Sequence, residues 1–185
     1  MKIDLPERLD GEVVALRRMR DDDAPAFAGA FIEDPDLGRL LGFDEDPTQD
    51  AVIERVAQAP IKAGQGRAAE FSICSIEGER FLGSMLLHSF AWEHLRCEVG
   101  FWVLPKLRGN GFAADALSRT CRWVFDDLGL ERMELTTTPD NAPTRALAAR
   151  LGFTEEGLQR RRNIERGRRV DFVLFGLLAE DWLAG

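Results

Sequence analysis

Residues 103–115, VLPKLRGNGFAAD, decide the fold, because a strand ends there and a glycine-bearing loop opens directly into a helix. The N–H groups at a helix start have no partners within the helix and lie at the positive end of its dipole. Gly109 and Gly111 would let an anionic group approach those donors closely, and Lys106 and Arg108 add positive charge. The segment favours a phosphate-binding loop, with an ordinary strand-to-helix connection as the alternative.

The run GNGFAA at 109–114 also satisfies the pattern GxGxxA of dinucleotide-binding proteins. Such a site normally follows the first strand of a β-α-β unit, whereas an antiparallel hairpin is predicted before this loop. The next predicted strand, MELTTT at 133–138, ends in threonines instead of the acid that binds a ribose. Both features argue against a dinucleotide.

Outward from this loop, hydrophobic periodicity and turn residues predict seven strands and four helices. The strands are expected at 12–19, 69–76, 81–90, 97–104, 133–138, 152–162 and 169–178. The helices are expected at 24–31, 47–62, 111–128 and 141–151, with the acids DDD at 21–23 capping the first. A hairpin followed by strands that alternate with helices predicts a mixed sheet with helices on both faces.

The composition indicates one globular domain spanning residues 1–185, with 45% apolar and 30% charged side chains. No apolar run approaches the roughly 20 residues that span a bilayer, and MKIDLPERLDGE lacks the apolar core of a signal peptide. We therefore expect a cytoplasmic protein without a membrane partner. Residues 1–100 carry 11 basic and 20 acidic side chains, which disfavours nucleic acid as a partner and is compatible with an amine. Acidity that only maintains solubility is the alternative.

The cysteines and histidines form no pattern typical of a disulfide framework or a metal site. Cys74, Cys97 and Cys121 lie in apolar surroundings with no CxxC pair, so we expect buried structural thiols. His88 and His94 are the only histidines, and no HExxH pattern contains them. We therefore predict no metal.

Several motifs together resemble the GNAT superfamily of N-acetyltransferases, in the order and spacing found there. The run RGNGFA at 108–113 resembles the Q/R-x-x-G-x-G/A loop that binds acyl-CoA. Asn141, Thr144, Leu147 and the run LGF at 151–153 resemble the family's N-x-x-S…L-x-x-x-L-G-F segment. EVGFWV before the loop, and EG…G…D…FGLL…DW near the C-terminus, resemble the RimJ/RimL-like branch, which includes N-terminal acetyltransferases of ribosomal proteins.

The resemblance implies an α/β (α+β) GNAT fold, with a mixed, mostly antiparallel sheet of about six to seven strands. The helical region 22–64 would roof the acceptor site. The pyrophosphate of acetyl-CoA would lie on the loop's backbone amides, and the pantetheine arm would add beside the preceding strand. An N–H near Val103 would face the thioester oxygen, and the Asn141 side chain would contact pantetheine, cap the next helix, or do both. The residues expected to bind acetyl-CoA are Phe101, Trp102, Val103, Arg108, Gly109, Asn110, Gly111, Phe112, Ala113 and Asn141.

The expected catalytic groups rest on the same resemblance, with one departure. Family members commonly place a tyrosine near the leaving thiol, and this chain contains none. Thr144 matches the position where the branch often has serine, so it is expected to protonate or hydrogen-bond the thiolate, or only to pack its methyl group. Glu98 is expected to take the proton of the incoming amine, directly or through water, or to be a solvated acid; His94 is the reserve base.

The expected reaction moves an acetyl group to a primary amine by direct attack in a ternary complex. An N-terminal α-amine of a protein or peptide fits best, because its pKa of about 7.7–8.0 leaves more neutral amine than a lysine near 10.4. A polyamine or aminoglycoside-like acceptor, another acyl-CoA donor and a non-catalytic CoA-binding sensor stay open, as does a homodimer. The arginines at 160–162, 166, 168 and 169 would hold an acidic acceptor or the CoA 3′-phosphate, or only protect an edge strand.

Overall fold

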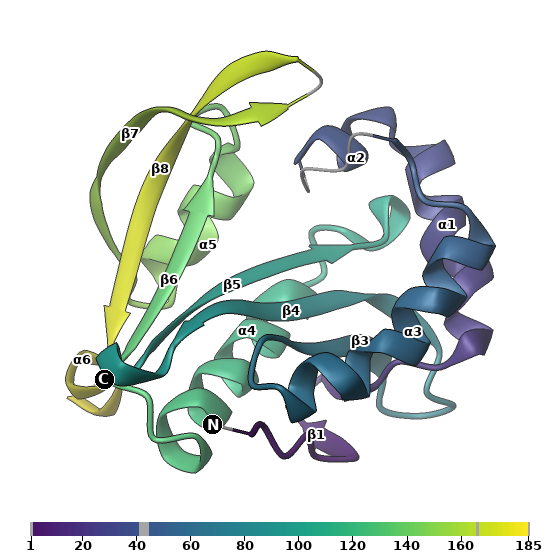
Figure 1. The fold of residues 1–185 in the computed structure, drawn as a ribbon, viewed down its shortest axis with the longest axis horizontal. Helices are drawn as coiled ribbons and strands as arrows, with labels where there is room; N and C mark the ends of the chain where they lie inside the picture. The colour runs from purple at the N-terminus through teal and green to yellow at the C-terminus, as the bar shows by residue number, and fades with distance from the viewer. Residues whose placement is uncertain (1, 41–44, 166, 185) are drawn as a thin grey trace.

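An eight-stranded sheet forms the centre of the protein, which a computed structural model describes over residues 2–40, 45–165 and 167–184 (Figure 1). The strand order is β1-β2-β3-β4-β5-β6-β8-β7. Neighbouring strands are antiparallel except β5 and β6, which are parallel. The strands are β1 Arg8–Asp10, β2 Val14–Arg18, β3 Ala69–Ser75, β4 Phe81–Ala91, β5 Arg96–Val103, β6 Arg132–Thr137, β7 Thr154–Glu165 and β8 Arg168–Leu178.

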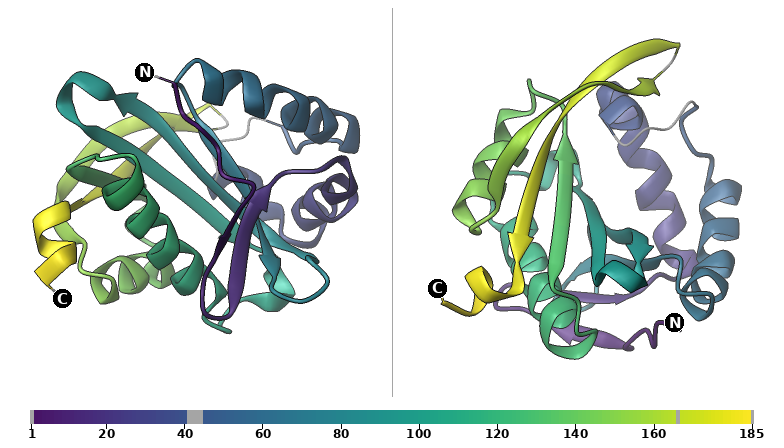
Figure 2. Two further views of the ribbon diagram at one scale, coloured as in Figure 1. Left: turned by 90° about the horizontal axis from the view of Figure 1, so that it is seen from below. Right: turned by 60° about the vertical axis from the view of Figure 1, so that its left-hand side comes forward.

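Helices cover both faces of this sheet, with α1 and α3 on one face and α4 and α5 on the other (Figure 2). This confirms the predicted mixed, mostly antiparallel sheet. The α-helices are α1 Ala24–Glu33, α2 Pro35–Leu40, α3 Gln49–Gly64, α4 Phe112–Arg122, α5 Ala142–Arg150 and α6 Ala179–Ala184. No helix in the described ranges is long and apolar enough to cross a membrane.

Each face of the sheet has its own hydrophobic core. Phe27 of α1 and Val52 of α3 pack with Phe81 and Trp102 on one face. On the other face, the side chains at alternate positions of the strands pack against α4 and α5; examples are Met85, Leu117, Met133, Leu135 and Ala148. The sheet therefore lies between α4 and the pair of helices α1 and α3.

Several details differ from the expectation, among them the short helix α6, which was not predicted. The strand β1 was not predicted, because three residues are too few to show a periodicity, and it forms only by pairing with β2. The helix predicted over 111–128 ends as α at Arg122 and continues as a π-helical turn, Trp123–Asp127. Asp23 lies at the start of α1 without capping it, because its carboxylate pairs with the buried Arg17 at 2.7 and 2.8 Å.

Candidate active site

The parallel strands β5 and β6 separate part-way along their length (Figure 1). Their pairing runs from Arg96 with Arg132 to Val99 with Leu135 and stops there. Beyond that point β5 pairs only with β4, and the N–H of Leu104 donates to Leu82 O at 2.8 Å. Because successive N–H groups of a strand alternate in direction, those of Phe101 and Val103 point into the gap.

The loop after β5 leads into the first turn of α4 through two glycines in the left-handed region. Gly109 has φ +82° and Gly111 has φ +80°, and no described atom lies within 4 Å of a Cβ built at either position. Asn110 stiffens the loop, because its side-chain N–H donates to Leu107 O at 3.1 Å. Within the described chain, no side chain caps α4. The loop at 109–111 is therefore open, and no described side chain covers the N–H groups in the first turn of α4.

The acidic side chain in the first turn of α4, Asp115, hydrogen-bonds the backbone of a distant turn instead of its own helix. Asp115 accepts hydrogen bonds from the backbone N–H groups of Glu12, Val13 and Val14 at 2.9, 2.8 and 2.9 Å. A Cβ at Gly11 would lie 2.4 Å from Asp115 Oδ2, so only glycine fits this turn. Asp115 thus joins α4 to the turn between β1 and β2 and does not cap its own helix.

The two cations of the loop form ion pairs with the end of α1. Lys106 Nζ lies 2.6 Å from Glu33 Oε1, and an Arg108 guanidinium nitrogen lies 2.7 Å from Asp34 Oδ2. Lys106, Arg108 and Glu33 are exposed to solvent, and exposed pairs of this kind contribute only about 0–1 kcal/mol. Arg108 is held more firmly than Lys106, because Asp34 is half-buried and Arg108 Nε also donates to Val103 O at 3.3 Å.

On the other side of the gap, α5 begins with an ordinary cap. Asn141 Oδ1 accepts the N–H of Thr144 at 3.3 Å, and Pro143 occupies the first turn. The capping alternative for Asn141 is therefore present in the structure. Thr144 is half-buried in this first turn and does not line the cavity described next.

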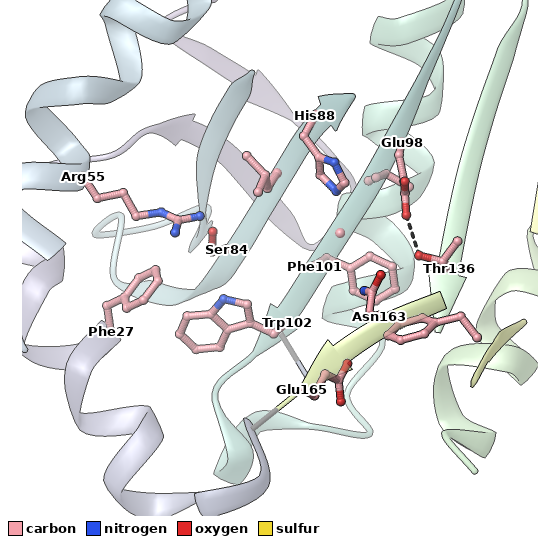
Figure 3. Close-up of a pocket in the computed structure, with 14 residues that line it drawn as sticks. Phe27, Arg55, Ser84, His88, Glu98, Phe101, Trp102, Thr136, Asn163 and Glu165 are labelled. Atoms are coloured by element: carbon pink, nitrogen blue, oxygen red, sulfur yellow. Dashed lines mark hydrogen bonds between the residues drawn. The ribbon is translucent and has the colours of Figure 1, made fainter. Parts of the chain in front are cut away.

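A cavity of about 400 Å³ lies beneath α1 and α3, where the gap begins (Figure 3). Glu98, Gly100 and Phe101 of β5 form its floor, and Thr136 of β6 lies beside them. Phe27 of α1 and Arg55 of α3 also line it, together with Ser84, Leu86, His88, Val99, Trp102, Asn163, Glu165 and Phe172. The predicted Glu98 and Phe101 thus meet in one place, whereas the loop at 108–113 lies beyond the end of β5.

The carboxylate of Glu98 is buried, with both oxygens in hydrogen bonds. Oε1 accepts the hydroxyl of Thr136, and Oε2 accepts a guanidinium N–H of Arg162 at 3.1 Å. Arg162 reaches this position through a bulge in β7, where Arg161 has φ +55° and its N–H donates to Asp171 Oδ1 at 2.6 Å. Bulges beside functional sites often redirect a side chain in this way. Of the arginine cluster, Arg166 lies outside the described residues.

His88 faces Glu98 across β4 and β5, where the two residues are directly paired. Burial and the positive Arg162 lower the pKa of His88 below its usual 6.5, against the opposing effect of Glu98, so the ring is neutral at pH 7. His94, the reserve base, is exposed in the turn Trp92–His94 and does not line the cavity.

Trp102 is one of the residues expected near acetyl-CoA, and its side chain belongs to a core. The ring is buried and lies edge-on to Phe27, with ring centroids 4.9 Å apart. It also contacts Phe31 and Phe81 edge-on, at 5.9 and 5.8 Å. The Trp102 side chain therefore lines the cavity as part of this core.

The three cysteines are buried, as predicted. Burial raises the pKa of Cys97 to about 12 and also raises the pKa values of Cys74 and Cys121. Thiols in such surroundings stay protonated and are poor nucleophiles. Among the described residues, no group of three or more His, Cys, Asp or Glu could hold a metal ion.

Comparison with known proteins identifies the family. Residues 14–154 match the acetyltransferase (GNAT) domain. The chain belongs to the GNAT acetyltransferases. The uncharacterized N-acetyltransferase YoaA of Bacillus subtilis is 25% identical over 170 residues, which cover 92% of this chain and 96% of YoaA. The [ribosomal protein uS5]-alanine N-acetyltransferase of Escherichia coli is 30% identical over 89 residues, 48% of this chain and 46% of that enzyme.

A solved structure extends this likeness to the fold. Mycobacterium smegmatis RimJ, determined in complex with CoA-disulfide, superposes with a TM-score of 0.83 at 27% identity. The superposition covers 94% of this chain and 85% of RimJ. This GNAT enzyme is therefore an N-acetyltransferase related to ribosomal-protein acetyltransferases, as the RimJ/RimL-like motifs predicted.

Proposed function

We propose that this enzyme transfers the acetyl group of acetyl-CoA to the N-terminal α-amine of a protein or peptide. The observation that carries the proposal is the gap between β5 and β6, which opens beside the start of α4, a helix start that no described side chain caps. One relative is named as acetylating an alanine of ribosomal protein uS5, and RimJ was solved with a CoA disulfide. Both names support this donor and this class of acceptor.

The residues around the gap fit acetyl-CoA. The open backbone at Gly109 and Gly111 leaves room for phosphate oxygens against the N–H groups of Phe112 and Ala113. The free N–H groups of β5 in the gap suit the amide carbonyls of a pantetheine arm, because an extended chain hydrogen-bonds there as a further strand would. Asn141 lies at the start of α5, where its amide can contact the same arm.

The chain's own residues then have distinct tasks. The N–H of Val103 points into the gap, where it can stabilise negative charge on a carbonyl oxygen. Glu98 is already hydrogen-bonded at both oxygens, so we assign it the task of drawing a cationic amine into the cavity. Thr144 would donate a hydrogen bond to the leaving sulfur. Bound acetyl-CoA supplies an acyl group on a thiol leaving group. A thiol with a pKa of about 8.5 leaves as a thiolate without a strong acid to protonate it.

Calorimetric titration with acetyl-CoA, with NAD as the control ligand, tests the donor. We expect a dissociation constant on the order of micromolar for acetyl-CoA, no heat with NAD, and unchanged acetyl-CoA affinity in Glu98→Gln. Absence of acetyl-CoA binding would overturn the proposal.

Thiol release tests the acceptor. The panel pairs peptides that carry a free α-amine with Nα-acetylated lysine peptides, and it includes polyamines, because Glu98 and Glu165 would also suit a small cationic amine. We expect turnover with the free α-amines. Turnover with polyamines alone would identify a small amine, and not an α-amine, as the acceptor. Binding of acetyl-CoA without any turnover would indicate a CoA-binding sensor.

A further inference from the structure

From the geometry of the cavity we infer that His88 accepts the proton of the attacking amine, and that Glu98 and Ser89 position it. The inference rests on the acetyl transfer proposed above, and it gives a catalytic role to a residue that belongs to none of the sequence motifs. In the step, the nitrogen lone pair forms the bond to the thioester carbon. The carbon–sulfur bond breaks with its electron pair going to sulfur, and the proton lost by nitrogen passes to His88 Nε2.

The position of the imidazole supports this role. His88 Nε2 lies 3.9 Å from a Cβ built on Gly100, so the ring lies over β5 next to the point where β5 and β6 separate. Figure 3 shows the ring pointing into the cavity, between Ser84 and Glu98. An amine that attacks a thioester in the gap would approach from this cavity. His88 is therefore within the space where a proton acceptor is required.

The orientation of the ring is built into the chain. Nδ1 of His88 and Oγ of Ser89 share a hydrogen bond of 2.9 Å. Ser89 has φ +52° and lies where the register of β4 and β5 shifts. Such strained residues cluster at functional sites, where surrounding structure holds them. In the tautomer in which Nδ1 donates to Ser89, Nε2 keeps the lone pair that a base needs.

Glu98 is less suited to take the proton itself. Its oxygens accept hydrogen bonds from Thr136 and Arg162, and protonation would remove the negative charge that pairs with the Arg162 guanidinium. Its negative charge instead favours the imidazolium that forms on His88, its partner across the strands. The other charged groups that line the cavity are Glu165 of β7 and Arg55 of α3.

The first test compares His88→Gln with His94→Gln, since these are the only two histidines in the chain. We expect His88→Gln to lower kcat by about 10²–10⁴-fold with acetyl-CoA affinity retained, and His94→Gln to have wild-type kcat. In His88→Ala, added imidazole should restore part of the rate, which a merely structural role would not allow. A His88→Gln enzyme with wild-type kcat would overturn the inference while leaving the proposed function intact. A wild-type enzyme that acetylates no amine would overturn the proposed function and the inference together.

The second test is the pH dependence of kcat/KM for the amine, which reports the ionisation of the free amine and of the free enzyme. As pH falls, the kcat/KM of the wild-type enzyme should decrease in two limbs. The upper limb follows protonation of the α-amine, whose pKa is about 7.7–8.0, and the lower limb follows protonation of His88 below pH 6.5. His88→Gln should lack the lower limb. Glu98→Gln should keep that limb but move it to lower pH, because Glu98 raises the pKa of His88. Loss of the lower limb in Glu98→Gln, with its retention in His88→Gln, would make Glu98 the base.

Discussion

Helices α4 and α5 begin on the two sides of the gap between β5 and β6, and their first turns are completed in opposite ways. α5 carries Asn141 at its cap and Pro143 in its first turn, so its start is stabilised by the chain itself. α4 begins at Phe112, after Gly111, with no side-chain cap among the described residues, and its acid Asp115 binds the distant turn between β1 and β2. The chain thus caps the start of α5 and leaves the start of α4 without a side-chain cap in the part of the chain that the structure describes.

The largest expected effect comes from closing the open start of α4. Gly111→Glu places a carboxylate where we propose the pyrophosphate, and like charges in contact cost several kcal/mol. We expect acetyl-CoA affinity to fall by about 100-fold in calorimetry. Gly129→Glu is the matched control, because Gly129 also has positive φ, at +65°, and open space around it.

Gly129→Glu should lose a similar amount of stability to backbone strain and keep its acetyl-CoA affinity. If both variants bound acetyl-CoA equally well, α4 would be an ordinary helix start, and its contrast with α5 would have no functional meaning.

A smaller effect is expected at Asp115, whose carboxylate joins α4 to the turn at Glu12–Val14. Asp115→Ala leaves three backbone N–H groups without this acceptor, and water can replace it only in part. We expect a loss of about 2 kcal/mol in the free energy of unfolding, measured with urea. Asp127→Ala, an exposed acid beyond α4, should change stability by less than about 0.5 kcal/mol. Equal stabilities of the two variants would contradict the claim that the hydrogen bonds of Asp115 to this turn stabilise the protein.

Much of this contrast could be predicted from the sequence, because local patterns carry it. Glycines at 109 and 111 after a strand indicate an open loop, and Asn141 before Pro143 indicates a capped helix. The alternation of apolar residues gave the strands and helices in the right order. Placing Glu98 in the cavity required only that its strand lie beside the gap, which the family resemblance implied.

His88 could not be identified in the same way, because its role depends on strand register. Its pairing with Glu98 is set by the turn at Trp92–His94, where Leu95 has φ +46°, and no local pattern fixes that geometry. The contact between Arg162 and Glu98 joins residues 64 positions apart and depends on a bulge. The sequence did contain one clue to His88. Ser84, Leu86 and His88 alternate along one strand, so their side chains lie on the same face of the sheet, where they line the cavity.

The smallest expected effect separates the two tasks of Asn141, which caps α5 and is proposed to contact pantetheine. Asn141→Ala should lower the free energy of unfolding by about 1 kcal/mol through loss of the cap. It should also weaken acetyl-CoA binding by about fivefold, which corresponds to one hydrogen bond. Asn141→Ser distinguishes the two losses, because serine caps a helix as well as asparagine does but has a shorter side chain. Urea unfolding should recover in Asn141→Ser while calorimetric affinity does not. Recovery of both would mean that Asn141 serves α5 alone, and the helix stabilised by the chain would then take no part in holding the ligand.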